Sequence, residues 1–597
     1  MGGIQFFGSL TIFYLMFGNL SAQDNNKLTW WNPAKSDIAV VAGQAWYDEL
    51  PGTYARLPKR AKKLVHAPLW KLSRNAAGLS LRFWSDASSI TVRYTVKGNI
   101  SMPHMPATGV SGVDLYAKTS DGEWSWYRGN FAFGDTIQYK YSNIDAKDRY
   151  HDQGREYQLY LPLYNEVEWL EIGIPDSAYL EPIPIRKERP VVIYGTSIAQ
   201  GACASRPGMA WTSILERKLD RPLINLGFSG NGKLEKEVID LITEIDAKVY
   251  VLDCLPNLWA NNDRSLEDVA KLIRDGIYQI RQERPHTPIL LVEHAGYSDG
   301  PVDTNRYNAY IDLNRVAEEI FLELQAEGVL NLYLLSKEEL NLSMEGFVDG
   351  THPTDMGMME YALSYEKRIR EIIKEPIGIF STTYPVTQAR EPAMYVWEQR
   401  HQELLQLNQE EAPKIGVVGN SIVHYWGGTP VGPHANGAAS WETNFGNLKV
   451  RNFGFGWDRI ENALWRVYHD ELDGISLDQV VLMIGTNNEH LNTDEEIVGG
   501  LEHLIKAVRQ RQPKARILMI GLLPRVGKET RISKLNGQIK DMASFVNVDY
   551  ADIGRVLLGK DQKIEATLFS DGLHPNSKGY SVLGKALREA LHIDTKE

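Results

Sequence analysis

The sequence predicts an all-β sandwich followed by two α/β modules, each built around a parallel sheet. Between residues 28 and 180, runs such as 79–84 and 90–96 alternate apolar and polar side chains. This period of two is typical of half-buried strands. From residue 190, short apolar runs alternate instead with amphipathic segments, and the same alternation starts again near residue 415. Strand and helix in alternation predict parallel strands with helices on both faces of the sheet.

The chain length of 597 residues is too great for a single hydrophobic core and fits about three domains. Changes in pattern set the expected boundaries. These are a signal peptide over residues 1–22, a β-sandwich over 23–185, module 1 over 186–375, a linker over 376–413 and module 2 over 414–597. The linker contains prolines and is expected to form a polar helix at 397–409.

Individual elements follow from the same patterns. In the β-sandwich we expect strands at 79–84, 90–96, 112–116, 124–127 and 156–161. In module 1 we expect strands at 191–194, 249–252, 289–292 and 330–334, and helices at 211–219, 266–281 and 307–325. In module 2 we expect strands at 415–418, 450–453, 479–484, 516–520 and 546–550, and helices at 460–468, 495–510 and 577–591.

Composition limits the class of partner. Hydrophobic residues make up 43% and charged residues 23% of the chain, as in ordinary folded proteins. The net charge of −12 argues against a nucleic-acid partner, because phosphate binding needs a basic face. The 15 Trp and 28 Tyr residues fit a protein that stacks on sugars, although for any one of them packing in a β-rich core is the simpler interpretation.

The N-terminus predicts export. Residues 4–17 are mostly apolar, and Leu20-Ser21-Ala22 offers small residues before a cut ahead of Gln23. The run is too short for a membrane span, and no later stretch reaches that length. The residue directly after the cut is Gln23 and not a Cys, so no lipid anchor is expected. We expect a soluble periplasmic or secreted protein.

The two cysteines, Cys203 and Cys254, have no metal-binding spacing. Both follow expected strand ends in module 1, so they could lie close together. An oxidising compartment would permit a disulfide. A disulfide and two buried free thiols remain equal alternatives.

A repeated pair of motifs carries the chemistry. Asp349 precedes His352 by three positions, and Asp571 precedes His574 in the same way. This spacing lets a carboxylate orient an imidazole. Far upstream of each pair, a strand runs into a small-residue turn that ends in a serine, which is Ser197 in module 1 and Ser421 in module 2. A hydroxyl needs a base to become a nucleophile, so the sequence predicts two Ser-His-Asp triads.

Acyl transfer also needs donors for an oxyanion. Each module offers a glycine-rich loop, at 225–230 and 452–457, and a later strand that ends near an Asn, which is Asn257 or Asn487. The G-x-S-x-G elbow of α/β-hydrolases is absent, because Ala199 and Val423 stand two positions after the serines.

These blocks, in this order, resemble the SGNH (GDSL-type) hydrolase family, and within it the acetylhydrolase and carbohydrate-esterase branch. The resemblance covers residues 190–374 and 414–592, and 111–116 fit the G-x-D-L-Y motif of a β-domain that precedes one subfamily. It implies three-layer αβα modules. It also implies roles for residues: nucleophiles Ser197 and Ser421, bases His352 and His574, orienting acids Asp349 and Asp571, and oxyanion donors Gly230, Asn257, Trp457 and Asn487.

Four residues depart from the family pattern. Thr196 and Asn420 stand where the family has Asp before the serine, and this position is mostly structural. Trp457 replaces the oxyanion glycine, so the N–H remains while an indole overhangs the site. Asn257 lies in L-P-N, whereas the family has G-x-N-D at this point.

We therefore expect an exported serine esterase that removes O-acetyl groups from an oligo- or polysaccharide, with no metal or organic cofactor. A lipase, thioesterase or lysophospholipase of the same fold is one alternative. A glycan-binding protein with one or both modules inactive is another. Trp426, Trp441 and Trp457 could stack on a sugar or simply pack, and Arg206 is either structural or a clamp for a substrate carboxylate.

Overall fold

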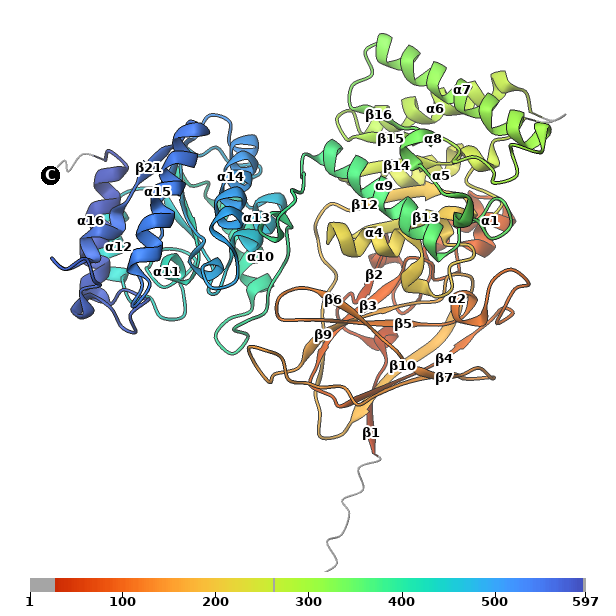
Figure 1. Cartoon of the computed structure of the whole chain (residues 1–597). Helices are drawn as coiled ribbons and strands as arrows, with labels where there is room; N and C mark the ends of the chain where they lie inside the picture. The colour runs from red at the N-terminus through yellow and green to blue at the C-terminus, as the bar shows by residue number, and fades with distance from the viewer. Residues whose placement is uncertain (1–26, 261–263, 594–597) are drawn as a thin grey trace, which may run out of the picture.

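The computed structural model describes residues 27–260 and 264–593. Figure 1 shows a β-domain at the N-terminal end, module 1 seated on it, and module 2 beside both. The expected signal peptide lies outside the described residues. None of the helices within the described residues has the length and apolar character needed to cross a bilayer.

The β-domain is the expected sandwich of antiparallel sheets. One sheet has the strand order β1 (Leu28–Trp31), β10 (Val167–Pro175), β4 (Ser89–Val96), β8 (Ile137–Ser142) and β7 (Asn130–Ala132). The other has the order β11 (Leu180–Pro182), β3 (Ser80–Ser85), β9 (Arg155–Tyr160), β5 (Asp114–Lys118) and β6 (Trp124–Tyr127), with β2 (Val41–Ala42) paired to β3. Alternate side chains such as Leu81, Phe83, Val92 and Tyr94 meet between the sheets, as the period of two predicts.

Module 1 has a parallel sheet with the order β13 (Leu223–Gly227), β12 (Val191–Gly195), β14 (Val249–Asp253), β15 (Ile289–Val292) and β16 (Leu332–Leu335). Its helices are α3 (Ser197–Gln200), α4 (Trp211–Leu219), α5 (Lys236–Thr243), α6 (Leu266–Glu283), α7 (Thr304–Ala326), α8 (Lys337–Leu340) and α9 (Asp355–Ile373). Val192 and Tyr194 point into one buried cluster and Val191 and Ile193 into another, so both faces of the sheet are covered.

Module 2 repeats this design. Its parallel sheet has the order β18 (Val450–Gly454), β17 (Ile415–Gly419), β19 (Gln479–Met483), β20 (Arg516–Ile520) and β21 (Asp549–Ala551). Its helices are α11 (Ser421–His424), α12 (Ala438–Phe445), α13 (Ile460–Tyr468), α14 (Asp494–Arg511), α15 (Glu529–Phe545) and α16 (Ser577–Ala590). Strand β13 and helices α5, α8, α12 and α15 were not among the elements expected from the sequence.

The strand order places the site. In both modules the first strand lies between the second and the third, so the connections leave it in opposite directions. A crevice forms outside the carboxyl ends of the strands at such a point. The serine follows the first strand, the oxyanion loop the second and the Asn the third, so all three reach the same crevice.

The segment expected to be a linker is part of the packed structure. It contains α10 (Trp397–Glu410), whose Trp397 and Leu404 belong to the core of module 2. Module 1 also contacts module 2 directly: Asp220 accepts a hydrogen bond from the Trp465 indole (2.9 Å), and Lys248 pairs with Asp470 (3.1 Å). Two short helices that precede module 1 in the chain pack against its buried clusters. They are α1 (Ala67–Leu72) and α2 (Ala107–Val110).

Candidate active site

Each serine stands at the first turn of a short helix that directly follows the first strand. Thr196 caps α3 through a hydrogen bond from the Ile198 N–H, and Asn420 caps α11 through one from the Ile422 N–H (3.0 Å). The residue before the serine therefore fixes the helix start, which explains why Thr, Asn or Asp can serve there. Gly195 is required because a Cβ would lie 2.8 Å from the Asp253 carbonyl oxygen.

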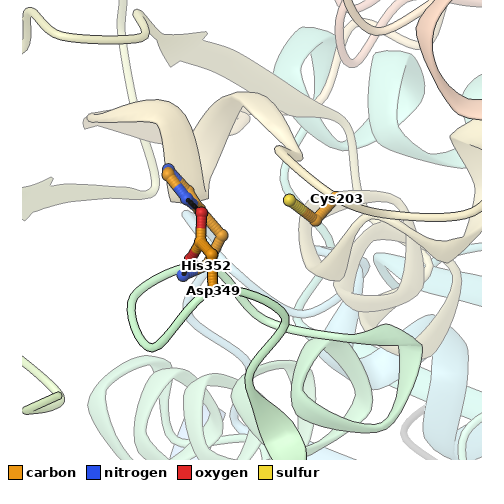
Figure 2. A group of neighbouring side chains, drawn as sticks. All are labelled: Cys203, Asp349 and His352. Atoms are coloured by element: carbon orange, nitrogen blue, oxygen red, sulfur yellow. Dashed lines mark hydrogen bonds and ion pairs between the residues drawn. The ribbon is translucent and has the colours of Figure 1, made fainter. Parts of the chain in front are cut away.

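The structure brings the three expected residues of module 1 together. Ser197 Oγ lies 2.8 Å from His352 Nε2, and His352 Nδ1 lies 2.8 Å from Asp349 Oδ2. The other carboxylate oxygen of Asp349 accepts the backbone N–H of His352 (2.8 Å) and of Thr351 (3.1 Å). One turn therefore orients both its carboxylate and its imidazole, and Figure 2 shows them on this loop.

Module 2 has the same arrangement. Ser421 Oγ lies 2.9 Å from His574 Nε2, and His574 Nδ1 lies 2.7 Å from Asp571 Oδ2. Asp571 Oδ1 accepts the N–H groups of His574 (2.7 Å) and Leu573 (2.9 Å). Gly350 and Gly572, with φ of 81° and 80°, give both turns the left-handed residue they need.

Burial alone would raise the pKa of the Asp349 carboxyl, but the hydrogen bonds from the His352 backbone and ring hold this pKa below its usual range. The same balance lowers the pKa of Asp571, where the His574 backbone and ring and the Leu573 N–H oppose burial. Both carboxylates are therefore ionised at neutral pH. An ionised carboxylate fixes the imidazole tautomer that leaves Nε2 free to accept a proton from serine.

The expected oxyanion residues occupy matching positions. Gly230 has φ of 69° and Trp457 has φ of 61°, so both modules place a left-handed residue at the same point of the loop. Within residues 27–260 and 264–593 the N–H groups of these two residues take part in no hydrogen bond. Asn257 Nδ2 donates to the Asn231 carbonyl oxygen (2.5 Å), and Asn487 Nδ2 donates to that of Asp458 (3.0 Å). Each Asn is thus tied to the oxyanion loop.

Sequence reasoning missed a second pair of matching residues. Gln200 Oε1 accepts the Ser229 N–H (2.9 Å), and His424 Nδ1 accepts the Gly456 N–H (2.9 Å). Each acceptor stands three positions after the serine, and each donor stands one position before the oxyanion residue. Burial, followed by nearby arginines, lowers the pKa of His424 to about 2, so its ring is a neutral acceptor. The sequence signal was that Gln200 and His424 each stand three positions after the serine. The two side chains differ in type, so the shared position was not recognised as a shared role.

Two buried arginines support the same loops. Arg56 of the β-domain donates to the Gly227 carbonyl oxygen (2.6 Å), and Arg400 of α10 donates to that of Gly454 (2.8 Å). Each guanidinium also lies over the ring of the following phenylalanine, at 4.7 Å in module 1 and 5.3 Å in module 2. The segment before each module therefore supports the loop that is expected to carry the oxyanion donor.

The cysteines are free and buried. The Cys254 thiol donates to the Tyr194 carbonyl oxygen (3.5 Å), while the Cys203 sulfur approaches the triad, with one donor atom each of Cys203, Asp349 and His352 within 4.8 Å of one another (Figure 2). Burial and the nearby Asp349 raise the pKa of Cys203 to about 12, so it is a neutral thiol. The alternative of two free thiols is the one that the structure shows.

The surroundings of the two triads differ. His104 of the β-domain stacks beside His352, with ring centroids 6.2 Å apart. Near His574 the Tyr425 ring lies at 5.5 Å and donates its hydroxyl to Glu391 (3.0 Å). Burial raises the pKa of Glu391, although this hydrogen bond and nearby imidazoles oppose the rise.

Other expected candidates have structural roles. Trp426 and Trp441 are buried in the core of module 2, whereas the Trp457 side chain is 37% exposed. Arg206 pairs with Asp114 and donates to the Tyr116 hydroxyl (2.8 Å). It therefore joins the G-x-D-L-Y strand to module 1.

Comparison with known proteins agrees with this geometry. Residues 188–370 and 417–582 each match a GDSL-like lipase/acylhydrolase family, and residues 28–180 match the N-terminus of SGNH-hydrolase-type esterases. The human platelet-activating factor acetylhydrolase IB subunit alpha2 is 30% identical over 200 residues, which are 33% of this chain and 83% of that protein.

The chain belongs to the GDSL-like lipase/acylhydrolase family. A solved structure from Bacteroides ovatus, described by its sequence family as a GDSL-like lipase, is 31% identical and covers 58% of this chain and 98% of its own, with a TM-score of 0.52. The protein is an ester-hydrolysing enzyme.

Proposed function

We propose that both modules are serine esterases that remove O-acetyl groups from carbohydrate. The observation that carries the proposal is the duplicated chain of contacts from serine Oγ to imidazole and from imidazole to carboxylate, with each distance between 2.7 and 2.9 Å. These distances let the imidazole take the serine proton without rearrangement.

The steps follow from the groups present. Ser197 or Ser421 attacks the ester carbonyl, and its proton passes to Nε2 of His352 or His574. The imidazolium then protonates the ester oxygen of the sugar, which leaves as a free hydroxyl. The same imidazole next takes a proton from water, the hydroxide attacks the acetyl-enzyme, and the proton returns to the serine oxygen as acetate leaves. The paired carboxylate stabilises the imidazolium in each step.

The oxyanion donors are the N–H of Gly230 with the Asn257 amide in module 1, and the N–H of Trp457 with the Asn487 amide in module 2. Each Asn uses one amide hydrogen on the loop carbonyl and keeps the other for substrate. Donors held in place before the reaction cost no reorganisation when the charge develops. No metal or cofactor enters the mechanism.

Acetyl as the acyl group is supported by the curated relatives, whose names describe acetylhydrolases. Carbohydrate as the leaving group is supported by the exposed Trp457 indole at the oxyanion position, because an aromatic face suits the C–H face of a sugar. We also propose export, from the apolar residues 4–17 and the small residues before Gln23. N-terminal sequencing of the mature protein from the producing cell tests export.

A second candidate is the acetyl ester of a lipid. The relatives favour it, because their name gives platelet-activating factor as the substrate. Acetylated oligosaccharides and an acetylated ether phospholipid, offered at equal concentration, separate the two. Faster acetate release from the phospholipid by both modules would exclude the carbohydrate assignment.

The direct test measures acetate release from a panel of acetylated glycans by wild type, Ser197→Ala, Ser421→Ala and the double variant. Each single variant is expected to lose roughly three or more orders of magnitude on the glycan that its module serves. The double variant is expected to lose activity on every glycan. Undiminished activity in the double variant would refute the proposed mechanism.

A further inference from the structure

Two loops of the β-domain reach the site of module 2. The turn between β5 and β6 carries Asp121, which accepts hydrogen bonds from Arg390 (2.7 Å) and Arg459 (2.9 Å). The Ala389 N–H donates to the Ser120 carbonyl oxygen (2.9 Å). In Figure 1 the loops of the β-domain near the labels β6 and β9 lie next to the segment that leads into α10. The β-domain is therefore anchored to module 2 as well as to module 1.

The second loop brings an aromatic ring to the oxyanion residue. Tyr150 and Trp457 contact each other edge to face, with ring centroids 5.5 Å apart and planes at 64°. The Tyr150 hydroxyl accepts a hydrogen bond from Arg459 (2.6 Å), and Arg390 donates to the Trp457 carbonyl oxygen (3.0 Å). The same two arginines that bind Asp121 thus hold the Tyr150 hydroxyl and the backbone of Trp457.

Trp457 is unusual for its backbone position. Its φ of 61° is a conformation that most residues other than glycine avoid. The matching residue of module 1 is Gly230, where an added Cβ would meet nothing within 4 Å. The packing around Trp457 therefore holds an indole beside the oxyanion donor in module 2 only, and 37% of this residue stays exposed.

We propose that the β-domain completes the second active site. Trp457 is the platform on which the acetylated sugar ring of the module 2 substrate stacks, and Tyr150 is the residue from the β-domain that holds this indole in position. Indole and sugar meet through apolar faces, while the sugar hydroxyls face the solvent and the exposed Arg149, whose guanidinium lies 5.3 Å from the centroid of the Tyr150 ring.

This inference rests on the proposed function, since it names a sugar as the ligand. It distinguishes the two modules, because no indole stands at Gly230. It also gives the contact between the β-domain and module 2 a role in substrate selection.

The experiment uses the full chain with Ser197→Ala, so that only module 2 reports. In this background Trp457→Gly keeps the N–H and the left-handed backbone but removes the platform. The expected result is a KM for an acetylated oligosaccharide about tenfold higher than that of the Ser197→Ala parent, with the rise in KM exceeding any fall in kcat. Tyr150→Ala is expected to raise the same KM roughly threefold to tenfold, and Tyr150→Phe, which keeps the ring, less than Tyr150→Ala.

Because Tyr150 acts through Trp457, the double variant should resemble Trp457→Gly alone rather than add the two effects. Phe131→Ala is the matched control, since it removes another exposed aromatic ring from β7 of the same domain. Thermal unfolding of each variant confirms that it is folded.

Two outcomes overturn the inference while leaving the proposed function intact. One is an unchanged glycan KM in both Tyr150→Ala and Trp457→Gly. The other is an equal loss of kcat on p-nitrophenyl acetate and on the glycan, which would assign these rings to the integrity of the oxyanion loop. If the Ser197→Ala parent hydrolyses p-nitrophenyl acetate but releases acetate from no glycan, the carbohydrate assignment of module 2 fails together with this subsite.

Discussion

Replacing His424 separates support of the oxyanion loop from proton transfer. His424 is 1% exposed, and its Nδ1 accepts the Gly456 N–H one residue before Trp457. His424→Ala removes the acceptor and leaves a buried N–H unpaired, which costs about 1–3 kcal/mol. Without this hydrogen bond the loop shifts and the Trp457 N–H moves away from the developing oxyanion. Losing about this much transition-state stabilisation lowers kcat roughly 10- to 100-fold.

The assay is steady-state hydrolysis of p-nitrophenyl acetate by the Ser197→Ala chain, with His424→Ala and His424→Gln compared across pH. Gln is the residue that module 1 uses at this position, so His424→Gln should regain an acceptor and recover most of kcat. Since the pKa of His424 is lowered to about 2 by burial, its ring does not titrate in the working range. The pH–rate profile should therefore keep its shape in both variants.

The reasoning about His424 is refuted if His424→Gln is as slow as His424→Ala, or if either variant changes the pH at which activity is lost. Gln200→Ala in the Ser421→Ala chain is the matched test in module 1. It removes the acceptor of the Ser229 N–H. It should lower the activity of module 1 by a similar factor.

Further predictions concern the triads, the loop supports and the thiols. Asp571→Asn should lower kcat of module 2 roughly 10²- to 10⁴-fold, because an amide cannot fix the same imidazole tautomer; retained activity in the Ser197→Ala chain would contradict this. Folding lowers the pKa of the Asp349 carboxyl, so this group stabilises the protein fully above the pKa of a free carboxyl and loses that effect as the pH falls through the lowered pKa. Unfolding measurements on wild type and Asp349→Asn at a series of acidic pH values check this sign. Arg56→Ala should abolish module 1 activity and lower its melting temperature while module 2 remains active, because buried carbonyl oxygens lose their donor. Cys203 and Cys254 should both be alkylated by iodoacetamide when the protein is unfolded without reductant. If mass spectrometry finds both cysteines unalkylated, they form a disulfide and this expectation is wrong.

Most of the site geometry could be predicted, because it follows from strand order and from short spacings along the chain. A serine after the first strand and an Asn after the third lie at the same sheet edge whenever the strands are parallel. An Asp three positions before a His forms its contacts within one turn, as Asp571 does with His574. Only the meeting of His574 with Ser421 needed the tertiary fold, and the repeated order of motifs already indicated it.

The supports of the oxyanion loop could not be foreseen in the same way. Gln200 and His424 have one role but different chemistry, so no residue pattern unites them. Arg56 and Arg400 come from segments that look unrelated in sequence, one in the β-domain and one in the expected linker. Each makes its contact across a domain boundary or a long chain separation.

By itself, the sequence determined the parallel sheets, the sandwich and the two sets of catalytic candidates, because strand period, turn residues and short motif spacing are local properties of the chain. Only the tertiary structure decided which parts complete each site. It placed Tyr150 against Trp457 and Arg56 beneath the loop of module 1. Contacts between domains depend on the complementarity of whole surfaces, and no local pattern in the chain encodes that complementarity.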